Sequence, residues 1–192
     1  MSKKEKPFDR PPLSEKGDKD PDAIFLSVGR CLSTWERTEE SYAHLYGTFI
    51  KPMYASYAAK RSYGALASGR GRQDLLVKSS EVFFRNFPSP ETKAAVSDAV
   101  KLYASAGSRR NEIAHGMLGS NQVDAGIFYF LVPSMWNSNK RGMNLEIEFR
   151  YSSKDIDHFE GLFGGLRSQV LELCEKVIDV FQAAPEKHRR KW

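Results

Sequence analysis

The chain has little of what marks membrane, secreted or metal-binding proteins. Its 192 residues include only two cysteines, and no apolar run approaches the about 20 residues of a membrane-spanning helix. The first 20 residues lack the apolar centre of a signal peptide. Cys31 and Cys174 fall in apolar helical patterns rather than in a metal-ligand spacing, so we expect buried free thiols. We therefore expect a protein of the reducing cytoplasm, with no metal, no cofactor and no membrane contact.

Several common catalytic signatures are also missing. The chain has no P-loop, no G-x-G-x-x-G fingerprint after a strand, no C-x-x-C pair and no H-E-x-x-H. The stretch Gly69-Arg70-Gly71-Arg72 is interpreted instead as a flexible basic loop. The chemistries that depend on these signatures therefore have no support in the sequence.

The charge of the chain is moderately positive. A formal net charge of +5 and a pI near 9.1 permit nucleic-acid binding without requiring it. Much of the excess lies in short clusters: Lys3, Lys4 and Lys6; Arg70 and Arg72; Arg109 and Arg110; Lys187, Arg189, Arg190 and Lys191. Solvated tails and loops carry such clusters too, so charge alone does not identify a binding surface.

Apolar residues recur at alternating spacings of three and four along two long segments, which is typical of amphipathic helices. The first stripe runs from Ile24 to Phe49, on a helix that opens near Asp20-Pro21-Asp22 and ends before Pro52. The second stripe runs from Ile156 to Val180. Shorter helices are expected at 53–66, at 73–87, and from Pro90 towards residue 109, with the passage through Gly107 and Ser108 left open.

One region shows the period of a strand instead. Leu145, Ile147, Phe149 and Tyr151 alternate with polar residues, and the apolar segment 126–132 is the expected partner, with Trp136 near the tip of the connecting loop. The sequence thus predicts a mainly α fold, a helical bundle with a β-hairpin at about 126–151 inserted before the last long helix. Residues 1–20 are expected to be a disordered charged arm, 21–184 the helical domain and 185–192 a basic tail.

The segment 109–116, RRNEIAHG, is the most informative part of the chain and is called the motif from here on. It brings two guanidinium groups, an amide and an imidazole together within about two helical turns. Cleavage of a phosphodiester without metal needs cations to stabilise the phosphorane and a group that transfers protons near neutral pH. On a regular helix Asn111 and His115 share a face, whereas Arg109 and Arg110 point to either side of it.

The motif resembles the R-x4–6-H signature of the HEPN superfamily, small helical domains many of which are RNases. This resemblance implies an HEPN-like bundle and a metal-independent endoribonuclease. It implies that Arg110 contacts the scissile phosphate, Asn111 orients the phosphate or the histidine, and His115 handles protons. Arg109 is the alternative phosphate ligand, because its spacing to His115 also fits the family pattern.

The resemblance also bears on partners. HEPN proteins commonly build their site at a two-fold dimer, which here would bring His115 and its symmetry mate to one cleft. They often act in toxin–antitoxin or antiphage defence systems, so RNA, a second copy of the chain and an antitoxin or defence-system protein are the expected partners. Trp136 and the tyrosines are candidates for stacking on an unpaired base.

Two other interpretations of the motif stay open. A histidine followed by glycine at a helix end can simply cap carbonyl groups, and the arginines beside it can be ordinary surface charge. In the second interpretation the chain is a non-catalytic helical dimer that binds RNA, a nucleotide or a protein partner. Arg109 and Arg110 then bind a phosphate group.

Overall fold

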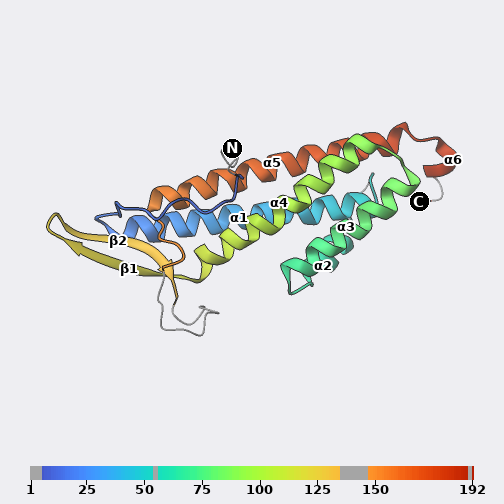
Figure 1. The fold of residues 1–192 in the computed structure, drawn as a ribbon. Helices are drawn as coiled ribbons and strands as arrows, with labels where there is room; N and C mark the ends of the chain where they lie inside the picture. Colours follow the sequence, from blue (N-terminus) through green and yellow to red (C-terminus); the bar gives the residue numbers. More distant parts are fainter. Residues whose placement is uncertain (1–5, 54–55, 135–146, 190–191) are drawn as a thin grey trace. The chain divides into compact units, whose positions relative to one another are not determined.

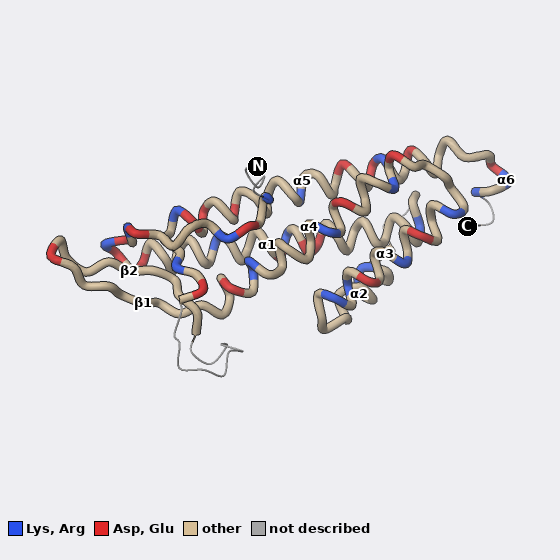
Figure 2. Tube along the Cα trace, viewed as in Figure 1, with Lys and Arg blue, Asp and Glu red and all other residues tan. Residues whose placement is uncertain are grey.

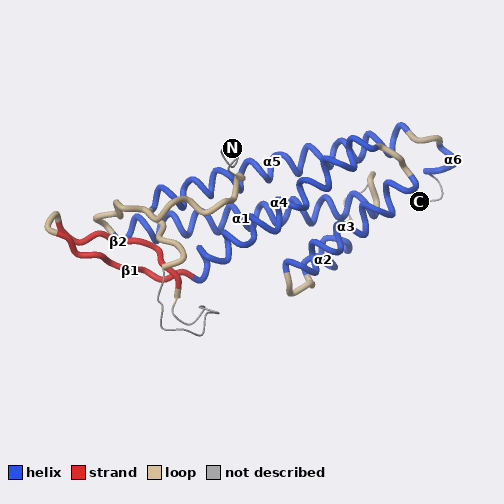
Figure 3. Tube along the Cα trace, in the orientation of Figure 1, coloured by secondary structure: helices blue, strands red, loops and turns tan. Residues whose placement is uncertain are grey.

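The computed structural model describes residues 6–53, 56–134, 147–189 and 192. Six helices and two strands follow in the order α1 (Pro21–Ile50), α2 (Tyr57–Gly64), α3 (Gly69–Asn86), α4 (Pro90–His115), β1 (Gly116–Val123), β2 (Gly126–Pro133), α5 (Ser153–Ala183) and α6 (Glu186–Arg189) (Figures 1 and 3). The predicted fold class, mainly α with a small β-hairpin before the last long helix, is confirmed. None of the described helices is both long and apolar enough to cross a membrane.

The ends of the long helices follow from local chemistry. At the start of α1 the Asp20 carboxylate accepts a hydrogen bond from the Asp22 amide at 2.9 Å, and the helix stops before Pro52. At the start of α5, Ser152 and Asp155 form a reciprocal cap in which the Asp155 carboxylate accepts from the Ser152 amide at 2.8 Å. Both helices therefore begin and end close to where the apolar stripes predict.

The chain divides into two compact units, and α1, α4 and α5 contribute to both. Unit 1 comprises residues 1–35 and 105–163, and unit 2 comprises 36–104 and 164–192. Each has its own aromatic core. In unit 1 Trp35 meets Phe163 edge to face at 5.1 Å, and in unit 2 Phe49, Phe83 and Phe87 pack together.

The hairpin differs from the expected one in its first strand. The predicted strand at 126–132 exists as β2, but it pairs along its whole length with β1, from Gly116 opposite Pro133 to Val123 opposite Gly126. Only two residues connect β1 to β2, so this hairpin closes with less loss of chain entropy than one with a long loop. Gly126, directly after the turn, has a φ of +121°. Of the described residues 147–151, only Tyr151 pairs with β2, by two hydrogen bonds to Leu131. Trp136 lies outside the described residues.

The first turn of α3 corrects one local expectation, and α4 settles a point that the sequence left open. The stretch 69–72, interpreted as a loop, is the first turn of α3, because the Ser68 hydroxyl accepts from the Gly71 amide at 3.0 Å and caps the helix. The fourth helix passes through Gly107 and Ser108 without a break and ends only at His115. The motif therefore lies on continuous helix up to its last residue.

The N-terminal arm from Lys6 onward is not the disordered segment that its composition predicts. Phe8 is buried against Phe163, with ring centroids 5.8 Å apart. Asp18 exchanges backbone hydrogen bonds with Tyr129 of β2, at 2.8 and 3.0 Å, and its carboxylate accepts from the Ser153 amide at the start of α5. Residues 6–18 thus run along unit 1 as an integral part of it (Figure 1).

The end of the chain is likewise anchored by one aromatic residue. Trp192 meets Phe83 and Phe87 edge to face, and its indole nitrogen donates to the Phe49 carbonyl at 3.2 Å. The basic tail expected at 185–192 therefore carries the short helix α6 and a docked tryptophan as well as charge.

Packing of the arm gives a testable difference in stability. Phe8→Ala should lower the free energy of unfolding by about 3 kcal/mol, because a buried ring is removed from contact with Phe163. Leu13→Ala is the matched control, since Leu13 belongs to the same arm but is 46% exposed. Urea denaturation of the three proteins measures the effect, and equal stabilities for both variants would contradict the packed arm.

Candidate functional site

Residues 109–115 of the motif form the last turns of α4. The helical period places their side chains on two different faces of the helix. Ile113 is 1% exposed and anchors the segment in the core of unit 1. The Arg109 and Glu112 side chains, three residues apart, are 11% and 13% exposed. Asn111 and His115 are exposed on the other side of the helix. The motif therefore has a structural face and a solvent face.

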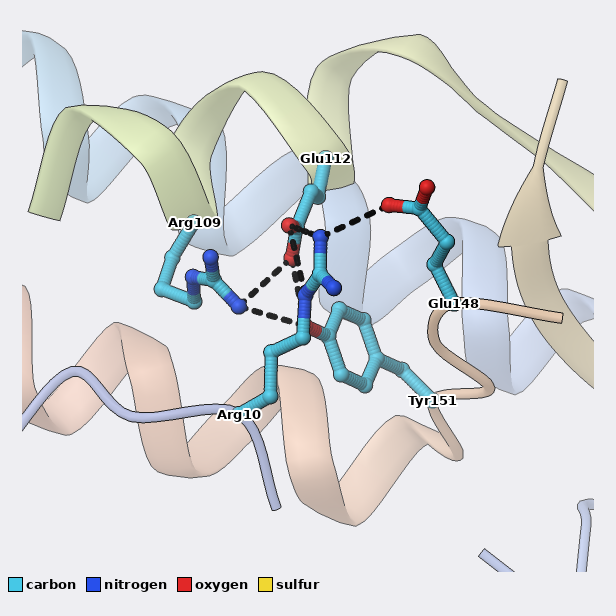
Figure 4. A network of polar contacts seen from close by, with 5 residues as sticks. All are labelled: Arg10, Arg109, Glu112, Glu148 and Tyr151. Carbon is cyan, nitrogen blue, oxygen red and sulfur yellow. Dashed lines mark hydrogen bonds and ion pairs between the residues drawn. The ribbon is translucent and has the colours of Figure 1, made fainter. Parts of the chain in front are cut away.

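The structural face is organised around the Glu112 carboxylate (Figure 4). Arg109 on the same helix forms an ion pair with it at 2.9 Å, and Arg10 of the arm donates from Nε and Nη2 at 2.9 and 2.6 Å. The Tyr151 hydroxyl donates to Glu112 Oε2 at 2.6 Å and accepts from Arg109 Nη1 at 3.4 Å. Arg10 also reaches Glu148 at 3.1 Å. One carboxylate thus links three separate segments of unit 1.

The charges of this network reinforce one another. Burial, followed by the hydrogen bond to Glu112, raises the pKa of Tyr151 well above its usual range, so the hydroxyl stays a donor at neutral pH. Burial is the largest single influence on Arg10 and opposes its charge, but the hydrogen bonds to Glu112 and Glu148 and the nearby negative charge together outweigh burial, so the pKa of Arg10 is raised. The Glu112 carboxylate therefore interacts with three donor side chains: Arg10, Arg109 and Tyr151.

On the solvent face Asn111 and His115 are exposed, and Arg110, the third predicted site residue on this side, is half-buried. Arg110 Nη1 donates to Asn111 Oδ1 at 3.2 Å, so the arginine side chain bends towards the face that holds Asn111. The His115 side chain, one helical turn further along, forms no hydrogen bond or ion pair with any residue that the structure describes. The unbroken helix rules out a break near Gly107 as a way to bring an arginine towards the imidazole.

Arg109 lies apart from this group. Its guanidinium is engaged by Glu112 and Tyr151, whereas Arg110 stays on the side of Asn111. The structure thus separates the two arginines that the sequence left as alternatives: Arg109 belongs to the buried network.

Sequence reasoning missed the residues that hold the motif in place. Glu112 has a local signal, since a glutamate three residues after an arginine on a helix is a common ion pair. Arg10 lies 102 positions from Glu112, and no local pattern links it to the motif. Tyr151 was recognised only as an apolar strand residue.

Elsewhere the described residues offer a second buried carboxylate but no metal centre. In unit 2, Glu39 of α1 pairs with Arg72 at 3.2 Å and accepts from the hydroxyls of Tyr103 and Tyr63, at 2.8 and 3.5 Å. Within the described ranges no group of three or more His, Cys, Asp or Glu side chains could hold a metal ion.

Comparison of the chain with protein-family models, with curated proteins and with solved structures finds no match. The assignment of the site therefore rests on the geometry of the described residues.

The Glu112 network predicts a large difference between two conservative substitutions. Glu112→Gln should lower the free energy of unfolding by about 3 kcal/mol, because two arginines lose the charge that compensates their burial. Glu148→Gln should cost less than about 1 kcal/mol, since Glu148 is 40% exposed and solvent screens its ion pair with the 39% exposed Arg10. Thermal and urea unfolding compare the variants. Equal effects would mean that Glu112 is not the centre of the network.

Proposed function

We propose that the chain is a metal-independent endoribonuclease of the HEPN type that acts through Arg110, Asn111 and His115. The observation that carries the proposal is the hydrogen bond from the Arg110 guanidinium to the Asn111 amide oxygen near the end of α4, where Asn111 and His115 are exposed. Glu112 and Arg109 secure the inner side of the same turns, so the exposed groups project from a fixed support.

The proposed reaction uses the neighbouring hydroxyl of the RNA as nucleophile. The 2′-oxygen attacks the adjacent phosphorus as it loses its proton, and the bond from phosphorus to the 5′-oxygen breaks. The products are a 2′,3′-cyclic phosphate and a 5′-hydroxyl, so neither water nor an external cofactor enters this step. Arg110 stabilises the additional negative charge on the phosphorane, and Asn111 orients a phosphate oxygen.

His115 is assigned the proton transfer. An imidazole side chain can take the proton from the 2′-hydroxyl or give one to the departing 5′-oxygen. A second proton carrier is then either solvent or His115 of a second copy at a composite cleft, as the family resemblance implies. The toxin or antiphage role that the resemblance implies is part of the same proposal.

A second candidate function is binding without cleavage. The motif offers a single imidazole, and metal-free RNA cleavage is most efficient with two proton-transferring groups. In that case Arg110 and Asn111 hold a phosphate and His115 contributes to binding alone. RNA that binds to the native chain but stays intact would favour this function.

Cleavage is tested with a single-stranded RNA in EDTA. His115→Ala should abolish cleavage, and Arg110→Ala should slow it by about 10²–10³-fold, the usual effect of removing one donor to a developing charge. Products should carry 2′,3′-cyclic phosphates, and 2′-O-methyl RNA and DNA should bind without being cut because they lack the attacking hydroxyl. His158→Ala is the matched control, since His158 is another exposed histidine of unit 1.

The same assay can contradict the proposal in three ways. Cutting of DNA, a requirement for magnesium, or unchanged cleavage by His115→Ala would each mean that another mechanism operates. Circular dichroism of each variant separates loss of chemistry from loss of fold.

Mixing of inactive variants distinguishes one-chain from two-chain sites. If each site uses residues of one chain, a mixture of His115→Ala and Arg110→Ala proteins should stay inactive. If Arg110 of one chain acts with His115 of the other, mixed dimers should regain a measurable part of native activity, because one of the two Arg110–His115 pairs is then intact. Cleavage rates at fixed total protein, before and after exchange of subunits, give the answer.

A further inference from the structure

The hairpin has one protected edge and one open edge. On the outer side of β2, Tyr129 exchanges hydrogen bonds with Asp18, and Leu131 exchanges them with Tyr151. On the outer side of β1, no hydrogen bond from any other described segment reaches the strand. The arm and the segment before α5 therefore cover only one of the two edges.

The pairing of the hairpin shows which groups face outward from β1. Directly opposed residues of an antiparallel pair turn their backbone groups either both inward or both outward. Tyr129 and Leu131 turn theirs outward, and they lie opposite Ser120 and Leu118. Gly116, Leu118, Ser120 and Gln122 consequently present their backbone N–H and C=O groups along the open edge.

This edge lacks the features that usually prevent strands from pairing with other chains. Natural edge strands carry charged side chains, proline or bulges. β1 reads Gly-Met-Leu-Gly-Ser-Asn-Gln-Val, with no charged residue and no proline, and Figure 2 shows it without blue or red. It has no bulge in its pairing with β2. Met117 and Val123 are also 47% and 46% exposed, so pairing would cover apolar surface as well.

We propose that β1 pairs with β1 of a second copy of this chain, so that two hairpins form a four-stranded antiparallel sheet. A copy is the fitting occupant because an antiparallel edge is complementary to itself under a two-fold axis, and an uncharged strand does not repel its own copy. When the two-fold axis passes through Gly119, all four residues whose backbone groups face outward can form hydrogen bonds with the second copy. Leu118 then lies opposite Ser120 of the second copy, and Met117 lies opposite Asn121.

This interface is independent of the proposed function. In the register given, the two His115 residues stand at opposite ends of the joined strands, about 27 Å apart at 3.4 Å per residue. The dimer therefore contains two separate motifs rather than one shared cleft. Loss of RNA cleavage leaves the interface untouched, and loss of the interface leaves each motif complete.

Sedimentation equilibrium tests whether the open edge holds the dimer. Ser120→Pro removes an outward N–H but none of the hydrogen bonds within the hairpin, and it should raise the dimer dissociation constant at least about tenfold. Ser120→Ala keeps the N–H and should leave the constant within about twofold of the native value. Circular dichroism checks that both variants fold. A native chain that stays monomeric at high micromolar concentration, or a dimer that Ser120→Pro does not weaken, would overturn the proposal.

Cross-linking tests the register without relying on a disruptive variant. Met117 and Asn121 are both exposed, and opposed residues of a non-hydrogen-bonded pair suit a disulfide. Mild oxidation of a mixture of Met117→Cys and Asn121→Cys chains should give a covalent dimer well above the yield from either chain alone. Equal yields from the mixture and from the single variants would exclude this register.

Discussion

The fold of unit 1 depends on the neutralisation of one largely buried carboxylate. Glu112 accepts hydrogen bonds or ion pairs from Arg10, Arg109 and Tyr151, which come from the arm, from its own helix and from the segment before α5. A carboxylate withdrawn from water is costly unless all its oxygen lone pairs are used. The three segments must therefore be in place together, and this explains why a charged, proline-bearing arm lies ordered along the unit.

Unit 2 uses the same chemistry at Glu39. This carboxylate is shared by Arg72 and the hydroxyls of Tyr63 and Tyr103. Burial, reinforced by the nearby carboxylate, raises the pKa of Tyr103 to about 12 and raises that of Tyr63 further, so both hydroxyls remain donors at neutral pH. In each unit one glutamate, one or two tyrosines and one or two arginines fix side-chain directions that apolar packing alone leaves open.

Elements that depend on local periodicity can be predicted from the sequence. Contacts between segments that are distant in the sequence cannot. The long helices follow from three-four spacing and from Pro52, and β2 follows from its apolar run. The alternation holds at Phe149 and Tyr151, which are buried while Glu148 and Arg150 are more exposed, but packing on the core produces it rather than a strand ladder. Ile147, expected on the same face as these two aromatic residues, is 49% exposed. Phe8 is a single aromatic residue among charges, so the average composition of the arm conceals its role.

The helical period places the residues of the motif on two faces of α4. Arg109 and Glu112, three residues apart, are committed to the buried network, and their conformations are fixed by partners outside the motif. Asn111 and His115 are exposed and Arg110 is half-buried beside them, with a hydrogen bond from Arg110 to Asn111. Because the helix period separates the two sets, substitutions of Asn111 or His115 should leave the network on the inner face, and with it the position of the motif, unchanged.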